Sequence, residues 1–149
     1  MSPTLTFDIE TIPDVAGIRI LKNTDDKVSD AAVAAMAFKE RLEKTGSEFL
    51  PLHLHRVVAI SCVLRSNEGI RVWSLGGVDD TEAALVQRFF DGIEKFTPQI
   101  ISWNGGGFDL PVLHYRGLLS GVNAPRYWDM GEDDRDFKWN NYIGRYHAR

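Results

Sequence analysis

The sequence predicts an α/β domain with a mixed sheet, in which antiparallel strands come first and a parallel strand is added later. Two observations indicate this class. Segments with the two-residue period of strands are followed by segments with the 3.6-residue period of helices. A short turn joins two of the strands, whereas a helix separates them from the last strand, as a parallel connection requires.

The first strand is expected over residues 4–10, because apolar and polar side chains alternate there. One side of this strand carries Leu5, Phe7 and Ile9, and the other carries Thr6, Asp8 and Glu10. Pro13 follows and marks the end of the strand. The alternation predicts that one face of the strand is buried.

A helix and a hairpin are expected next. The helix over residues 29–44 begins at Ser29, a residue type that caps helix N-termini, and ends before Gly46. Two runs rich in Val and Ile, at residues 56–64 and 70–75, are joined by an Asn-Glu-Gly turn. The helix is therefore expected to be inserted between the first strand and the hairpin.

A further helix is expected to begin within residues 79–82 and to end at Lys95. Its apolar stripe consists of Leu85, Val86, Phe89, Phe90 and Ile93. A short strand is then expected over residues 99–103, and three glycines break it. The last predicted helix covers residues 109–119, with Pro111 tolerated in its first turn.

Length and composition limit the possible functions. The 149 residues are expected to form a single domain, 1–149, with one core. The single cysteine, Cys62, has no partner for an intramolecular disulfide, and no apolar run approaches about 18 residues, so we expect a cytoplasmic protein without a membrane span. The net charge of −4 argues against a general nucleic-acid coat. A small site remains possible if metal ions supply positive charge.

Two carboxylates lie near the end of the first predicted strand. Asp8 and Glu10 are two residues apart, so their side chains leave the same face about 6 to 7 Å apart. Their neighbours are apolar, which predicts an interior strand where unpaired carboxylates are costly unless a divalent cation binds them. The alternative, which accounts for most pairs of this kind, is the solvated face of an edge strand.

A second polar group follows the last predicted strand, in the run from Ser102 to Pro111. It places Asn104, Phe108 and Asp109 at a strand-to-helix junction. The helix dipole there is expected to favour the ionised form of Asp109, as a metal ligand requires. The glycines allow a substrate backbone to approach closely. Taken alone, this run has another interpretation, in which Asp109 only caps the helix and Phe108 only packs against its neighbours.

Together the two groups resemble the 3′–5′ exonuclease domains of the DEDD superfamily. The run from Phe7 to Thr11 is similar to the first motif of these domains, and Asn104-x-x-x-Phe108-Asp109 is similar to the second. The resemblance includes residues 51–61, covers nearly the whole chain, and looks closest to predicted exonucleases related to the proofreading domain of family B DNA polymerases. It implies a ribonuclease H-like, three-layer fold with a mixed central sheet.

The resemblance also implies roles for single residues. Asp8, Glu10 and Asp109 would be the catalytic carboxylates and would bind two Mg²⁺ or Mn²⁺ ions about 3.5 to 4 Å apart. The substrate-binding residues would be Thr11, Asn104 and Phe108. The expected partner is a nucleic acid with a single-stranded or frayed 3′ end, DNA rather than RNA. Little sequence preference is expected, because stacking on an aromatic side chain tolerates any base.

The family's third motif, Tyr-x-x-x-Asp or His-x-x-x-x-Asp, supplies a further carboxylate. After Asp109, no tyrosine or histidine is followed by an aspartate at that spacing. We therefore expect a C-terminally truncated domain with impaired activity. The acids at positions 129, 132, 133, 134 and 136 are interpreted as a solvated loop. His53 and His55 are interpreted as structural histidines.

Two other classes of protein stay open. A nucleotide-binding module is the first, because the glycines at positions 105–107 lie between a predicted strand and a predicted helix, although a third spaced glycine and a Lys-Ser or Lys-Thr pair do not follow. A non-catalytic domain that keeps the nuclease fold and binds nucleic acid or another protein is the second. The oligomeric state is not predicted.

Overall fold

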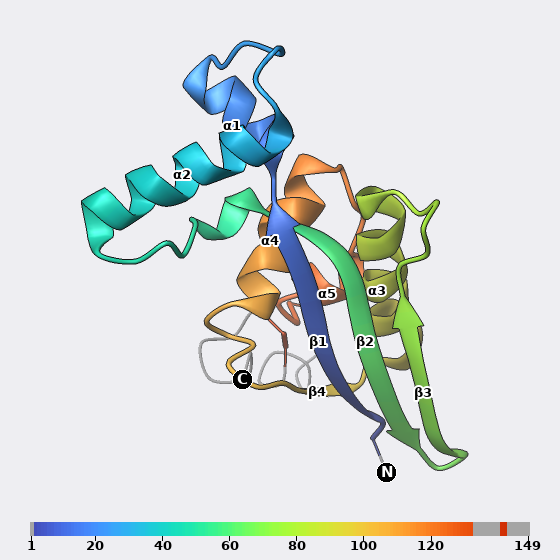
Figure 1. The fold of residues 1–149 in the computed structure, drawn as a ribbon. Helices are drawn as coiled ribbons and strands as arrows, with labels where there is room; N and C mark the ends of the chain where they lie inside the picture. Colours follow the sequence, from blue (N-terminus) through green and yellow to red (C-terminus); the bar gives the residue numbers. More distant parts are fainter. Residues whose placement is uncertain (1, 133–140, 143–149) are drawn as a thin grey trace. The chain divides into compact units, whose positions relative to one another are not determined.

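The computed structural model describes residues 2–132 and 141–142. The chain divides into two compact units, which are drawn in Figure 1. The first unit consists of Met1–Glu10 and Val57–Arg149, and the second unit consists of Thr11–Arg56. Each unit has its own group of buried apolar side chains.

The first unit contains a four-stranded sheet with the order β3-β2-β1-β4. The bounds of the strands are β1 Thr4–Pro13, β2 His55–Ser66, β3 Gly69–Leu75 and β4 Gln99–Ile101. Strands β2 and β3 are antiparallel, whereas β1 and β4 are parallel, with Thr4 opposite Gln99 and Thr6 opposite Ile101. The predicted mixed sheet, with its hairpin and its later parallel strand, is confirmed.

Three helices accompany this sheet: α3 Glu82–Phe96, α4 Asp109–Leu119 and α5 Pro125–Trp128. Figure 1 shows them behind the sheet. Helix α3 begins after Thr81, whose hydroxyl accepts a hydrogen bond from the backbone N–H of Ala84 at 3.2 Å. All five residues of the predicted stripe of α3 are buried. The bounds of α4 agree with the prediction, whereas α5 was not predicted.

The core of the first unit lies between β1 and α3. Leu5, Phe7 and Ile9 are buried, and the ring of Phe7 lies 4.9 Å from the ring of Phe89, measured between centroids. The residues between them in β1 are exposed. Because strand side chains alternate between the two faces, packing of the apolar face against α3 directs Asp8 and Glu10 to the opposite face.

A buried ion pair connects α3 and α4. Arg116 donates to Glu82 through Nε at 2.8 Å and through Nη2 at 2.5 Å, and both side chains are almost completely buried. Oε1 of Glu82 also accepts the backbone N–H of Val57, in β2, at 2.7 Å. The pair therefore holds two helices and one strand in a fixed arrangement, and α4 carries Asp109 at its first position.

The second unit contains the helices α1 Val15–Lys22 and α2 Asp30–Thr45 and the short 3-10 helix η1 Leu52–Leu54. The predicted caps of α2 are confirmed, since Ser29 accepts from Ala32 and Gly46 has a left-handed backbone conformation. Helix α1 was not predicted. The buried residues of this unit are Ile18, Val33, Ala37 and Leu50. None of the helices in the described ranges is long and apolar enough to span a membrane.

Candidate active site

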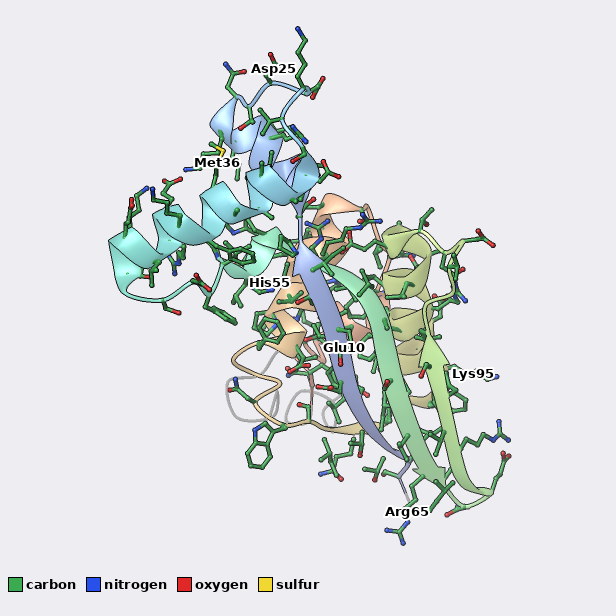
Figure 2. The ribbon with its side chains drawn as sticks, in the orientation of Figure 1. Glu10, Asp25, Met36, His55, Arg65 and Lys95 are labelled. Atoms are coloured by element: carbon green, nitrogen blue, oxygen red, sulfur yellow. The ribbon has the colours of Figure 1, made fainter. Side chains whose placement is uncertain are left out.

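Strand β1 places the predicted first-motif residues. Asp8 and Glu10 are exposed, on the face opposite the core (Figure 2 labels Glu10). Thr11 begins the second unit, and its hydroxyl is hydrogen bonded to Nδ1 of His55, in the same unit, at 3.0 Å. Nε2 of His55 lies 3.1 Å from the carbonyl oxygen of Leu50. The interpretation of His55 as a structural histidine agrees with these contacts.

Asp109 is the first residue of α4 and only 3% exposed. Burial raises the pKa of its carboxyl, and the negative charge of Asp8 acts in the same direction. Hydrogen bonds from its own backbone N–H and from that of Ile9 lower the pKa without offsetting these effects. The backbone N–H group at the helix terminus favours the ionised form, as expected, but the loss of hydration on burial has the larger effect on the pKa. The hydrogen bond from Ile9 and the electrostatic effect of Asp8 place Asp109 near β1.

The carboxylates of Asp8 and Asp109 form a candidate metal site. Their oxygen atoms are the ligand type that Mg²⁺ and Mn²⁺ prefer, and a divalent cation would remove the unfavourable effect of one carboxylate on the other. The structure does not bring Glu10 into this group, since no three His, Cys, Asp or Glu side chains among residues 2–132 and 141–142 are grouped as a metal site requires. The pair would supply two carboxylate ligands to a cation, and a second cation would need a further ligand.

The loop between β4 and α4 has a defined shape. Asn104 has a left-handed backbone conformation, with φ 54°, and its carbonyl oxygen accepts the N–H groups of Gly107 at 2.9 Å and Phe108 at 3.1 Å. The carbonyl oxygen of Gly105 accepts the N–H of Leu110 at 2.9 Å. These bonds fold the loop back onto the start of α4. Asn104 is exposed and Phe108 is half-buried next to Asp109.

Gly105 is required in this loop, because it is buried against Ser102. A Cβ atom at position 105 would lie 1.8 Å from Oγ of Ser102 and 2.7 Å from its Cβ. Within the described part of the chain, this Oγ is also a buried polar atom without a hydrogen-bond partner. Contacts this short do not occur in folded proteins, so any larger residue at position 105 must displace the loop.

Gly105→Ala is therefore expected to destabilise the protein by about 1–3 kcal/mol, as overpacking typically does, and to impair any activity that depends on Asn104 and Asp109. Ser102→Gly removes both of the short contacts. The double variant Ser102→Gly/Gly105→Ala should consequently recover most of the lost stability in thermal unfolding. If the double variant unfolds at the same temperature as Gly105→Ala, contact with Ser102 is not the cause.

Among the described residues, Asp129 of the acidic run and Cys62 have surroundings of their own. Asp129 accepts from Nη1 of Arg126 at 3.2 Å and from the N–H of Gly131 at 2.7 Å, so it has structural partners. Positions 133, 134 and 136 lie outside the described residues. Cys62 is buried, and burial raises the pKa of its thiol to about 11, which makes it unreactive at neutral pH.

The ion pair of Glu82 and Arg116 was not predicted, although the sequence of α4 contains a signal for a buried charge. Arg116 lies on the buried face of α4, three residues after Leu113 and four after Val112. A charged residue at such a position is rarely buried without an oppositely charged partner. The partner itself could not be predicted, because it lies 34 residues away in the sequence.

The comparisons with known proteins agree with this fold. Residues 47–149 match the family described as "Predicted 3′–5′ exonuclease related to the exonuclease domain of PolB". The match includes the second motif with Asp109, whereas Asp8 and Glu10 precede it. None of the curated proteins matches the chain.

A solved structure with a similar fold is the family B DNA polymerase from the hyperthermophilic archaeon Pyrobaculum calidifontis. The TM-score is 0.50 at 20% sequence identity, over 83% of this chain. The chain spans 12% of the length of that polymerase. With the four-stranded mixed sheet, this similarity confirms the ribonuclease H-like α/β fold. The chain belongs to the family of predicted 3′–5′ exonucleases related to the exonuclease domain of PolB; exonucleases of this type are hydrolases and generally depend on metal ions.

Proposed function

We propose that this protein is a metal-dependent 3′–5′ exonuclease that removes nucleotides from single-stranded or frayed 3′ ends by hydrolysis of the phosphodiester bond. The observation that carries the proposal is the buried carboxylate of Asp109 beside Asp8, although the two residues belong to different elements and are far apart in the sequence. A buried carboxylate next to a second one is unfavourable unless a cation is shared between them.

In the proposed site, Asp8 and Asp109 would hold Mg²⁺ or Mn²⁺, and Glu10, which is not grouped with them in the metal-free structure, would join as a further ligand when the metal binds. The metal supplies an activated water and stabilises the charge that develops on the scissile phosphate. The hydrogen bonds from backbone N–H groups orient the Asp109 carboxylate, and burial keeps water away from it. Two ions are proposed for the site, and they would need a ligand in addition to these carboxylates.

The loop after β4 would bind the substrate strand. Asn104 is exposed, so its side chain amide is free to meet the sugar-phosphate backbone near Asp109. Phe108 immediately precedes Asp109 and would pack beside the terminal nucleotide. Thr11 keeps its predicted role as a substrate-binding residue. DNA is the proposed substrate rather than RNA, and the proposed location is cytoplasmic.

A second candidate is a non-catalytic domain that binds nucleic acid with the same surface. It is favoured by one observation: the described residues contain no group of three side chains that could hold a metal ion. This candidate predicts that the chain binds a single-stranded oligonucleotide without shortening it. The exonuclease proposal predicts shortening that requires added metal.

The test uses the full chain and a single-stranded DNA oligonucleotide with a label at its 5′ end. With Mn²⁺ or Mg²⁺, the expected product is a ladder of fragments shortened from the 3′ end, and EDTA should abolish it. A circular single-stranded DNA serves as a control for contaminating endonuclease, and an RNA of the same sequence tests the proposed preference. Binding without any ladder would support the second candidate and contradict the first.

A further inference from the structure

The loop that leads to Asp109 carries an exposed tryptophan. The side chain of Trp103 is 94% exposed. Large aromatic side chains are normally mostly buried, because burial of their surface is among the largest favourable contributions to folding. Trp128, by contrast, packs against the rings of Tyr127 and His114. Trp103 therefore contributes little to the stability of the fold, and its exposure calls for another explanation.

The register of the sheet places Trp103 near the carboxylates. Thr6 of β1 is opposite Ile101, the last residue of β4, and the two strands run parallel. Asp8 lies two residues after Thr6, and Trp103 lies two residues after Ile101, so both leave the same end of the parallel pair. The chain then turns back to Asp109. Trp103 is thus on the loop that joins β4 to the proposed metal ligand.

The loop presents the indole in a limited range of positions. The hydrogen bonds to the carbonyl oxygens of Asn104 and Gly105 hold the backbone directly after Trp103, and Gly105 packs closely against Ser102. A side chain that is held by such a loop loses less conformational entropy on binding than one on a flexible segment. The loop is therefore suited to present a flat ring to a ligand.

We propose that Trp103 is a stacking surface for a base of the substrate strand, next to the nucleotide that is cleaved. The proposal rests on the proposed exonuclease function. It accounts for how a chain with a net charge of −4 would hold an anionic strand, since it cannot rely on many Lys and Arg contacts to phosphate. Stacking on an exposed aromatic ring supplies affinity without charge and accepts any base.

The experiment measures binding of single-stranded DNA oligonucleotides whose last 3′ linkages are phosphorothioates, so that they resist cleavage. Each oligonucleotide of the series lacks the base at one position, counted from the 3′ end. For the wild type, one missing base is expected to weaken binding by about 5- to 150-fold, the range for one stacked base. Fluorescence polarisation of a 5′ label gives the dissociation constants.

Trp103→Ala should bind the intact oligonucleotide more weakly by a similar factor and should become insensitive to the missing base at that position. Trp103→Phe should retain most of the affinity. Val78→Ala, which shortens another fully exposed apolar side chain of the first unit, is the matched control and should bind like the wild type. The melting temperature of Trp103→Ala should equal that of the wild type, because the indole is exposed.

Two results would overturn this inference. Trp103→Ala could bind as tightly as the wild type, in which case the indole serves another partner, such as a protein surface. Alternatively, it could bind weakly but remain as sensitive as the wild type to every missing base, which would show an indirect effect. If cleavage remains metal dependent in either case, only the stacking role fails. If the wild type neither cuts nor binds DNA, the proposed function fails as well.

Discussion

Asp109→Asn should reduce cleavage of a 3′ end by about 100-fold or more and should at the same time stabilise the metal-free protein at neutral pH. The loss of activity follows because the amide is a poor metal ligand, and metal ions typically contribute several kcal/mol of transition-state stabilisation, with each 1.36 kcal/mol equal to a factor of ten. Initial rates of shortening of a 5′-labelled oligonucleotide measure it. Asp79→Asn, which changes an exposed aspartate of the same unit, is the control and should retain full activity.

The gain in stability has a defined pH dependence. The pKa of Asp109 is raised in the folded protein, so the folded state binds the proton more tightly than the unfolded state. The contribution of Asp109 to stability is therefore present at low pH and is lost as the pH rises through the raised pKa. Asparagine carries no such charge, so the variant should melt at a higher temperature than the wild type only above that pH. The melting temperature should rise by about 2–4 °C for each kcal/mol gained in the free energy of unfolding.

Added metal should make the wild type more stable than Asp109→Asn. A ligand that binds only the folded state stabilises it by about 2.7 kcal/mol at 100 times its dissociation constant. Mn²⁺ should therefore raise the melting temperature of the wild type and have little effect on Asp109→Asn. If the variant were less stable than the wild type without metal at neutral pH, the raised pKa of Asp109, caused first by burial and then by the charge of Asp8, would be contradicted.

Arg116→Met should destabilise the protein by about 3–5 kcal/mol, because it leaves the carboxylate of Glu82 buried without its partner. This is a large part of the roughly 5–15 kcal/mol by which typical domains are stable. Urea unfolding, followed by circular dichroism, measures the change. Arg71→Met removes an exposed ion pair with Glu68 and is the matched control, with an expected cost below about 1 kcal/mol.

The double variant Glu82→Gln/Arg116→Met separates two costs of Arg116→Met. One is the unpaired buried charge of Glu82, and the other is the lost packing of the arginine side chain. Glutamine keeps an oxygen that can accept the N–H of Val57, and it carries no charge, so the double variant should be more stable than Arg116→Met alone. A double variant that is less stable than Arg116→Met would show that the unpaired carboxylate is not the main cost.

Local patterns in the sequence predicted much of the fold. The alternation in β1 and the stripe of α3 each identify a buried face without reference to the rest of the chain, and Ser29 and Gly46 mark the ends of α2. Helix α1 was missed because it has only eight residues, although Asp14 caps it by accepting the N–H of Gly17. The capping residue after Pro13 was the available signal.

The site could be predicted only in part. The motifs predict Asp8, Glu10 and Asp109 as metal ligands, and these roles stay predictions. The raised pKa of Asp109 arises first from burial by residues that are distant in the sequence, which a dipole argument at the helix terminus could not supply. The constraint at Gly105 likewise depends on how the loop folds onto Ser102. That Glu10 shares a metal with the other two carboxylates stays a prediction.

The central claim is that Asp8 and Asp109 bind a divalent cation together, and titration of the metal-free protein with Mn²⁺ tests it most directly. The electron paramagnetic resonance signal of free Mn²⁺ reports the bound fraction. The wild type should bind Mn²⁺, and added Mg²⁺ should displace it. Asp8→Asn and Asp109→Asn should each lose Mn²⁺ binding, whereas Asp79→Asn should keep it. A wild type that binds no Mn²⁺, or aspartate variants at positions 8 and 109 that bind it as well as the wild type, would contradict the claim.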